Sequence, residues 1–334
     1  MHTALLHRPK RLWLLVSTLL VLVQPAAWAE GNMRKVGIVT ILSVDAASRS
    51  PAYKRFTDTI RASAPDLNIS FEWRSAEGKN DRYPQIVTDL VQQQVHAIFT
   101  GPAPAAVAAK QVTTTVPVVF MIVANPVTLG LVKSLEKPGG NITGLYEERP
   151  DFPSKRITLL KEMAPQAKTI GILWDALSWA EPVGSEMTRE TEKAILAAGA
   201  RAVTVAVRGP DDLERAFSLL KQAQVDGLVV EQGPVFIFHA KKLADLAAGA
   251  KIPAIYPLSN YTQAGGLASF GPDLADNFER MGGYVGKILN GAKPADLPVE
   301  RTEKTHLIVN GKAAKDLGMT VPPQVRARAD SIIE

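Results

Sequence analysis

The sequence predicts an α/β protein of two similar lobes, each a parallel sheet covered by helices on both faces. Short apolar runs with the composition of buried strands alternate with segments of helical periodicity. This alternation occurs twice, over residues 36–143 and again over 157–256. Strand–helix alternation at this spacing is typical of parallel sheets. The chain of 334 residues is also long for one compact core and comfortable for two.

The N-terminus has the pattern of a secretory signal peptide, which we assign to residues 1–29. Basic residues precede an apolar run at 12–23, and Ala27-Trp28-Ala29 places small residues where a signal peptidase reads, so cleavage is predicted before Glu30. The alternative is a membrane anchor, but the run falls short of the ~20 apolar residues that a span needs. Because the chain has no cysteine, it is not a lipoprotein, and we expect the mature protein in the periplasm.

Composition excludes several classes of function. The absence of cysteine excludes disulfides, thiol nucleophiles and cysteine-type zinc sites. The formal charge of +5 falls to +2 without residues 1–29, which hold three basic residues and no acidic one. The mature chain is therefore nearly balanced, and with no dense basic run it gives no support for a nucleic-acid partner.

The first series of elements runs to about residue 143. Continuous or alternating apolar runs predict its strands, and apolar residues at helical spacing predict its helices. The predicted strands are 36–41, 69–74, 97–100 and 117–123, and the predicted helices are 52–62, 83–94, 103–112 and a short one at 127–135.

The second series repeats the pattern and ends in a long helix. We predict strands at 169–174, 202–207, 227–230 and 254–256, and helices at 157–163, 186–198, 211–224 and 240–248. The helix from Asp273 carries one clean apolar stripe. Gly282, Gly283 and Gly286 lie inside its pattern and not at its start, so we interpret them as sites of close packing and not as a dinucleotide fingerprint.

Candidate ligand contacts follow the predicted strands. Ligands of open parallel sheets bind outside the carboxyl ends of the strands, and the loops there are rich in hydroxyl and amide groups that lead into helices. Each such residue, taken alone, is as well explained by helix capping or core packing. The candidates are Thr40, Ser43, Thr100, Gly101, Asn125, Pro126, Trp174, Asp175, Glu231, Gln232, Tyr256 and Phe270.

Signals of catalysis are weak throughout. The sequence has no nucleophile elbow and no P-loop, and its histidines are scattered without metal-ligand spacing. We therefore expect no catalytic residues, no metal site, no cofactor and no enzymatic activity.

Several long motifs resemble the ABC transporter substrate-binding protein family, which includes tryptophan- and tyrosine-binding members. They follow one another in the family's order and cover nearly the whole mature chain. The motifs are PVTLGLVKSLEKPGGNITG at 126–144, SKRITLLKEMAPQAKTIGILW at 154–174, AGGLASFG at 264–271, GAKPADLPVE at 291–300 and AKDLGMT at 314–320.

The resemblance implies the type I periplasmic binding protein fold, with two Rossmann-like lobes joined by a three-crossover hinge. The N-terminal lobe would comprise residues 30–145 and 272–300, and the C-terminal lobe 146–271 and 301–334, with the ligand cleft between them. Two departures lie where a ligand would contact the protein. Asn125 stands where the family usually has aspartate, and Glu231-Gln232 follows a strand after which many relatives carry aspartate. Tryptophan or tyrosine is therefore not carried over as the ligand, although an amino acid remains open, with Glu231 as the candidate partner of an ammonium group.

The resemblance also implies the function. The chain would capture a small molecule, such as an amino acid or a related small carboxylate, by hinge closure. It would deliver this ligand to an ABC permease in the inner membrane, served by a cytoplasmic ATPase, and would act as a monomer. Two alternatives stay open: a periplasmic sensing module for a signalling receptor and, less favoured, a periplasmic enzyme.

Overall fold

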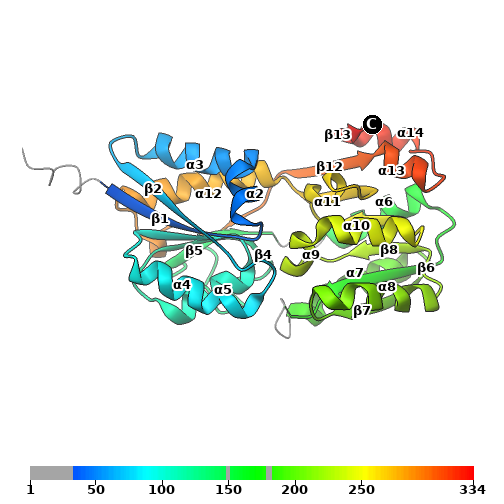
Figure 1. The fold of residues 1–334 in the computed structure, drawn as a ribbon, viewed down its shortest axis with the longest axis horizontal. Coiled ribbons are helices and arrows are strands. Elements are labelled where there is room, and N and C mark those ends of the chain that lie inside the picture. The colour runs from blue at the N-terminus through cyan, green and yellow to red at the C-terminus, as the bar shows by residue number, and fades with distance from the viewer. Residues whose placement is uncertain (1–32, 148–150, 178–182) are drawn as a thin grey trace, which may run out of the picture. The chain divides into compact units, whose positions relative to one another are not determined.

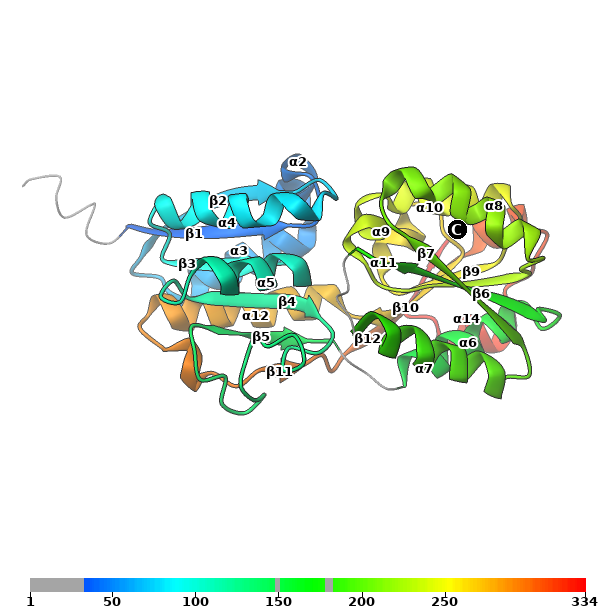
Figure 2. The same ribbon diagram turned by 90° about the horizontal axis from the view of Figure 1, so that it is seen from below.

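The computed structural model describes residues 33–147, 151–177 and 183–334. The predicted signal peptide and its cleavage site lie outside the described residues. Two sheets organise the described chain, each flanked by helices (Figures 1 and 2). We call each sheet with its helices a lobe.

The first lobe contains a six-stranded sheet in the order β11-β5-β4-β3-β1-β2, and its described strands pair in parallel. Helices α3 and α12 cover one face and α4 and α5 the other (Figure 1). Its strands are β1 (Met33–Thr40), β2 (Asn68–Ser75), β3 (Ala97–Thr100), β4 (Val118–Val123), β5 (Ile142–Tyr146) and β11 (Glu300–Arg301). Its helices are α2 (Val44–Arg49), α3 (Pro51–Ser63), α4 (Tyr83–Gln92), α5 (Ala103–Val112) and α12 (Leu274–Leu289), with single 3₁₀ turns at Asn80–Arg82 and Pro294–Asp296.

The second lobe contains a seven-stranded sheet in the order β13-β12-β10-β9-β8-β6-β7. It is parallel except where β10 meets β12. Figure 2 shows α6 and α7 on one face and α8 and α10 on the other. Its strands are β6 (Thr169–Asp175), β7 (Arg201–Val207), β8 (Gly227–Val230), β9 (Ala254–Tyr256), β10 (Ala268–Pro272), β12 (Thr305–Asn310) and β13 (Ser331–Ile333). Its helices are α6 (Phe152–Met163), α7 (Val183–Ala197), α8 (Leu213–Gln222), α9 (Pro234–Phe238), α10 (Ala240–Gly249), α11 (Ser259–Gln263), α13 (Gly311–Asp316) and α14 (Pro323–Arg328), with a 3₁₀ turn at Pro210–Asp212.

The chain passes between the lobes three times, after β5, after β10 and after β11. Two α/β lobes with mostly parallel sheets were predicted from the alternation of apolar runs, and the structure confirms them. The limits of each lobe in the sequence remain a prediction, because sheet membership assigns strands and not every connecting residue.

One predicted helix is wrong. Residues 127–130 form a turn and residues 131–135 are bends and irregular backbone, so no helix forms. The carbonyl of Pro126 accepts a hydrogen bond from the Leu131 amide at 2.8 Å, and Gly130 has a φ of +65°. Glycine adopts this left-handed backbone conformation readily, and at Gly130 it turns the chain away from a helical path.

Helix α12 returns from the second lobe and packs against α3 through two of its glycines. A Cβ added to Gly286 would lie 2.3 Å from Ser63 Cβ, and one added to Gly282 would lie 2.7 Å from the carbonyl oxygen of Phe56. An added Cβ on Gly283 meets no atom within 4 Å. Gly282 and Gly286 therefore allow the two helices to approach closely, and Gly283 has no such role.

We expect Gly286→Ala to lower the free energy of unfolding by about 1–3 kcal/mol, because the methyl group overpacks the α3–α12 interface. Gly283→Ala is the matched control on the same helix and should raise stability by about 0.5–1 kcal/mol, because alanine is the better helix former. Urea unfolding followed by tryptophan fluorescence measures both. Equal effects of the two substitutions would contradict the packing role of Gly286.

Candidate functional site

The carboxyl ends of β1 and β3 bring four predicted site residues to one edge of the first sheet. Thr40 is fully buried and its hydroxyl accepts a hydrogen bond from the Leu42 amide at 3.0 Å. Ser43 caps α2 by accepting from the Ala46 amide. Gly101 follows β3, and its amide donates to the carbonyl of Val39 in β1, the neighbouring strand, at 2.9 Å. Thr40, Ser43 and Gly101 therefore make hydrogen bonds that stabilise the local structure. A contact between each of them and a ligand remains a prediction.

Thr100, the last residue of β3, is different. Its side chain is fully buried, and its hydroxyl oxygen has no hydrogen-bond partner within the part of the chain that the structure describes. A buried hydroxyl without a partner costs free energy. Thr100 is therefore a first-lobe candidate whose hydroxyl has a hydrogen bond to offer a ligand.

Asn125 and Pro126 follow β4 and build the turn described above. The Asn125 side-chain oxygen accepts from the Thr128 amide at 3.0 Å. In this geometry the side-chain oxygen of Asn125 stabilises the turn. Its side-chain amide nitrogen could donate a hydrogen bond to a ligand.

Four predicted residues lie at the carboxyl ends of β6 and β8 in the second lobe, namely Trp174, Asp175, Glu231 and Gln232. Trp174 is half-buried within β6. Asp175 is fully buried, and its two carboxylate oxygens accept from the amides of Leu177 and Val235, which ties the end of β6 to the start of α9. Gly233 packs directly on Asp175, since an added Cβ would lie 2.4 Å from that of the aspartate. Asp175 thereby fixes the loop that carries Glu231 and Gln232.

Glu231 is almost fully buried and both of its carboxylate oxygens have partners. One oxygen accepts from the Thr191 hydroxyl of α7. The other lies 3.8 Å from the Arg156 guanidinium of α6, which is itself buried and donates through Nε to the carbonyl of Phe270 at 2.9 Å. Burial raises the pKa of Glu231 and lowers the pKa of Arg156, and each partner's charge opposes the other's shift. A ligand ammonium at Glu231 would have to compete with Arg156.

Glu147 joins the two lobes. It follows β5, is 6% exposed, and accepts from Gln232 Nε2 of the second lobe at 2.8 Å and from Asn277 Nδ2 of α12 at 3.3 Å. The Thr302 hydroxyl in turn donates to Asn277 Oδ1 at 3.0 Å. Burial raises the pKa of Glu147 to about 7, against the opposing effects of the two amide donors and of Arg156.

The sequence analysis did not select Glu147, Arg156, Thr191 or Asn277. Two of them carry a signal in hindsight. Arg156 occupies the apolar face of its helix, four positions before Leu160 and seven before Met163. Glu147 directly follows a strand, as the selected residues do.

The aromatic candidate Tyr256 lies in the core of the second lobe, next to another tyrosine. Tyr256 is fully buried and stacks on Tyr261 with ring centroids 5.1 Å apart, beside Gly266. Burial raises the pKa of Tyr261, with Asp175 adding to this shift, so its hydroxyl lies within electrostatic range of the end of β6. The hydroxyls of both tyrosines lack a hydrogen-bond partner among the described residues.

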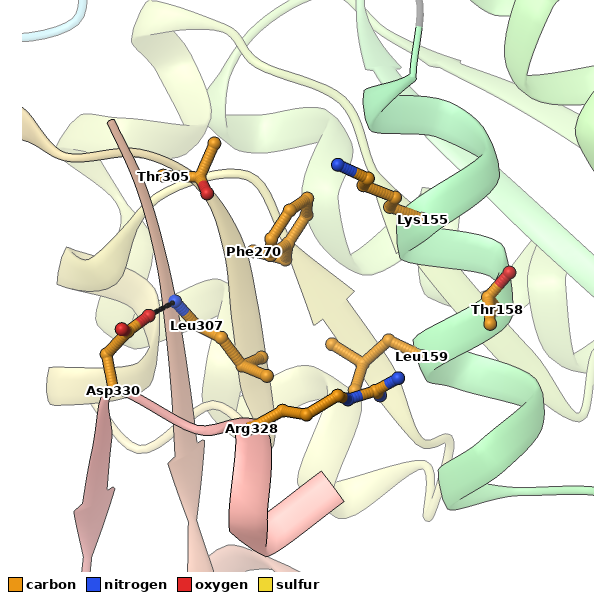
Figure 3. A pocket seen from close by; sticks show the side chains of 8 residues that line it. All are labelled: Lys155, Thr158, Leu159, Phe270, Thr305, Leu307, Arg328 and Asp330. Atoms are coloured by element: carbon orange, nitrogen blue, oxygen red, sulfur yellow. Dashed lines mark hydrogen bonds between the residues drawn. The ribbon is translucent and has the colours of Figure 1, made fainter. Parts of the chain in front are cut away.

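Phe270 lies in a separate cavity of about 410 Å³ on the second lobe (Figure 3). Figure 3 shows its ring between the side chains of Lys155, from α6, and Thr305, from β12. The other lining residues are Thr158, Leu159, Leu307, Arg328 and Asp330. The cavity is lined by no other predicted site residue. Arg156 connects Phe270 with the buried charges, because its Nε donates to the Phe270 carbonyl.

The described residues include no group of three or more histidine, aspartate or glutamate side chains that could hold a metal ion. Within the same ranges, no helix is long and apolar enough to cross a membrane.

Two α/β lobes, crossed three times by the chain and bringing buried polar groups together at their strand ends, are the architecture of a two-lobe binding protein. A model of the ABC transporter substrate-binding protein family matches residues 35–333, and the chain belongs to this family. The family comprises extracytoplasmic proteins that bind small molecules for a transporter. The resemblance identified in the sequence is thereby confirmed.

The relatives agree in fold and class. A tyrosine-binding protein of Clostridioides difficile (strain R20291) is 27% identical over 254 residues, which cover 75% of this chain and 71% of the relative. A conserved domain protein from Vibrio cholerae is 26% identical with a TM-score of 0.80, and an ABC domain from Streptococcus pneumonia in complex with L-Trp is 24% identical with a TM-score of 0.78. Each of these two structures covers 90% of this chain and is itself covered to 99%.

Proposed function

We propose that the chain is the periplasmic binding component of an ABC importer. It is exported by the signal peptide at 1–29, acts as a monomer, performs no chemistry on its ligand, and presents it to an inner-membrane permease powered by a cytoplasmic ATPase. The observation that carries the proposal is the convergence of buried polar side chains from both lobes at the carboxyl ends of their strands, in a chain of this family.

The proposed ligand is an amino acid or a related small carboxylate. Relatives support this class, since one is a tyrosine-binding protein and another was solved with L-Trp. Thr100 supports it from the first lobe, because its hydroxyl can donate to a ligand oxygen. Asp175, Gln232 and the Asn125 amide remain proposed contacts. Glu231 does too, although its pairing with Arg156 weakens the case for it as the sole partner of an ammonium group.

The test is a thermal-shift screen of the chain from Glu30 onward, unfolded and refolded first to remove any co-purified compound. The panel holds amino acids including L-Trp and L-Tyr, small carboxylates, purines, nucleosides and sugars. A ligand at 100 times its Kd stabilises by about 2.7 kcal/mol and raises the Tm by several degrees. One compound that shifts the Tm and is recovered unchanged supports the proposal. No shift across the panel contradicts the ligand class, and consumption of the hit would show an enzyme.

Thr100→Val should weaken binding of the identified compound about 2- to 10-fold, the cost of one lost hydrogen bond. It should leave the free energy of unfolding unchanged or slightly higher, because the hydroxyl it removes has no partner among the described residues. Isothermal titration calorimetry and urea unfolding measure the two effects.

Thr143→Val is the matched control from β5. The Thr143 hydroxyl donates to the carbonyl of Leu297 at 2.7 Å, so its loss should lower stability by about 1 kcal/mol and leave the Kd unchanged. If Thr100→Val behaves as Thr143→Val does, Thr100 is a structural residue and not a ligand contact.

A further inference from the structure

Glu147 is the residue whose side chain is held from both lobes at once. Gln232 belongs to the loop after β8 in the second lobe, and Asn277 belongs to α12, which packs on the first. Glu147 itself lies at the first of the three passages between the lobes, and Thr302, which supports Asn277, lies at the third. A hinge motion that separates the lobes would break the hydrogen bond between Gln232 and Glu147.

We propose that Glu147 is a positioning residue that couples lobe closure to proton uptake, and so sets the affinity of this binding protein for its ligand. The inference rests on the proposed function and adds to it the group that controls the equilibrium between open and closed forms. Glu147 does not have to touch the ligand for this role.

The direction of the effect follows from burial. In the described arrangement the pKa of Glu147 is raised from its ordinary value of 4.5 to about 7, because the carboxyl is desolvated. Opening the lobes admits water to the carboxyl, which lowers its pKa toward 4.5, and this effect exceeds the smaller, opposite effect of losing the Gln232 donor. The closed form therefore holds the proton more tightly. Closure is favoured fully below pH 4.5, and this contribution is lost as the pH rises through 7.

The charged groups near Glu147 include Arg156, from α6, which acts on its pKa. Arg156 is paired with Glu231, a second buried carboxyl whose pKa is raised by burial. The partners of Glu231, Arg156 and Thr191, both belong to the second lobe, so a motion between the lobes leaves these contacts in place. On α12, the charged side chains near Asn277 form ion pairs with other residues. These are Asp276 with Lys304 and Arg280 with Glu300.

The test measures closure without any ligand. The chain has no cysteine, so Lys79→Cys and Lys241→Cys label one exposed position on each lobe with pH-insensitive dyes for energy transfer. These positions flank a point of contact between the lobes, since a Cβ on Gly78 would lie 3.5 Å from Nε2 of His239. From pH 8.5 to pH 5.5 we expect the ratio of closed to open molecules to rise about 10- to 30-fold, as the two pKa values require.

Glu147→Gln, which mimics the protonated carboxyl, should be closed at pH 8.5 to the extent that the wild type is at pH 5.5, with a flat response between. Glu279→Gln removes an exposed carboxylate of α12 and should keep the wild-type response. Gln232→Ala, a second variant in case Glu147→Gln folds poorly, should reduce the closed fraction at every pH while keeping a response.

Three results would overturn the proposal: a wild-type distance that does not change with pH, a Glu147→Gln variant that responds as the wild type does, or a Gln232→Ala variant as closed as the wild type. The second would point to another titrating group, such as His239. Because no ligand is used, these outcomes are separate from the proposed function. A failed ligand screen with a pH-dependent distance would leave the coupling standing and the importer role unsupported.

Discussion

Arg156→Met is expected to lower the free energy of unfolding by about 3–5 kcal/mol, because it leaves the carboxylate of Glu231 buried without its cationic partner. Arg156 and Glu231 are 5% and 3% exposed in their side chains, so water cannot replace the lost charge. The substitution also removes the hydrogen bond from Nε to the carbonyl of Phe270. Methionine keeps the apolar stem of arginine, which limits the contribution of lost packing.

The loss of stability should depend on pH. The positive charge of Arg156 is the strongest influence that lowers the pKa of Glu231. Without it the effect of burial is less opposed, so the pKa of Glu231 rises further. A neutral carboxyl is tolerated in the core far better than a charged one. The difference from wild type should therefore be small in acid and grow as the pH rises.

The double variant Arg156→Met/Glu231→Leu provides the control. Removing both charges leaves neither unpaired, and replacement of a buried pair by apolar residues is often neutral or stabilising. Urea unfolding of the two single variants and the double variant gives the coupling energy between the side chains. A single variant that loses less than about 1 kcal/mol would mean that the charge of Glu231 finds another partner when Arg156 is absent.

Gly271→Ala is the second change with a large expected effect, of about 3 kcal/mol or more. Gly271 lies in β10 at the second passage between the lobes, and a Cβ there would stand 1.8 Å from the carbonyl oxygen of Pro257 and 3.5 Å from the guanidinium of Arg156. A backbone oxygen cannot rotate away as a side chain can. Relief would require moving β10 away from the end of β9, and with it the hinge strand.

Gly249→Ala, at the end of α10 in the same lobe, is the control for Gly271→Ala. No atom lies within 4 Å of its added Cβ, and it should be neutral or stabilise by up to about 1 kcal/mol. Thermal unfolding compares the pair. If the Tm of Gly271→Ala lies within a degree or two of that of Gly249→Ala, the Pro257 carbonyl does not restrict the space at residue 271.

The order and type of most helices and strands could be predicted because each depends on the pattern of apolar residues within its own segment. A strand buried on both faces must be apolar throughout, as at 118–123, and a helix with one buried face must repeat its apolar residues every three or four positions, as in α12. The helix expected at 127–135 was wrong because its apolar spacing was compatible with turns, and the hydrogen bond to the Pro126 carbonyl and the left-handed Gly130 decided between them.

The candidate site was predictable only in outline. Residues at strand ends such as Thr40, Thr100 and Asp175 do lie buried at the edges of their sheets. Their partners were not predictable, because Glu147 is 85 residues from Gln232 and 130 from Asn277, and no local pattern links them. Phe270 was selected as a candidate ligand contact, and the structure places its ring in a cavity on the second lobe that no other candidate lines (Figure 3).

The sequence by itself determined the two α/β lobes and the family, because periodicity and motifs are properties of neighbouring residues. It also predicted the sheet edges at which a ligand should bind. Only the tertiary structure decided which charges are neutralised internally and which side chain is shared between the lobes. Whether a carboxylate is exposed, paired as Glu231 is with Arg156, or buried with a pKa of about 7 as Glu147 is, depends on groups that the fold brings together from distant parts of the chain.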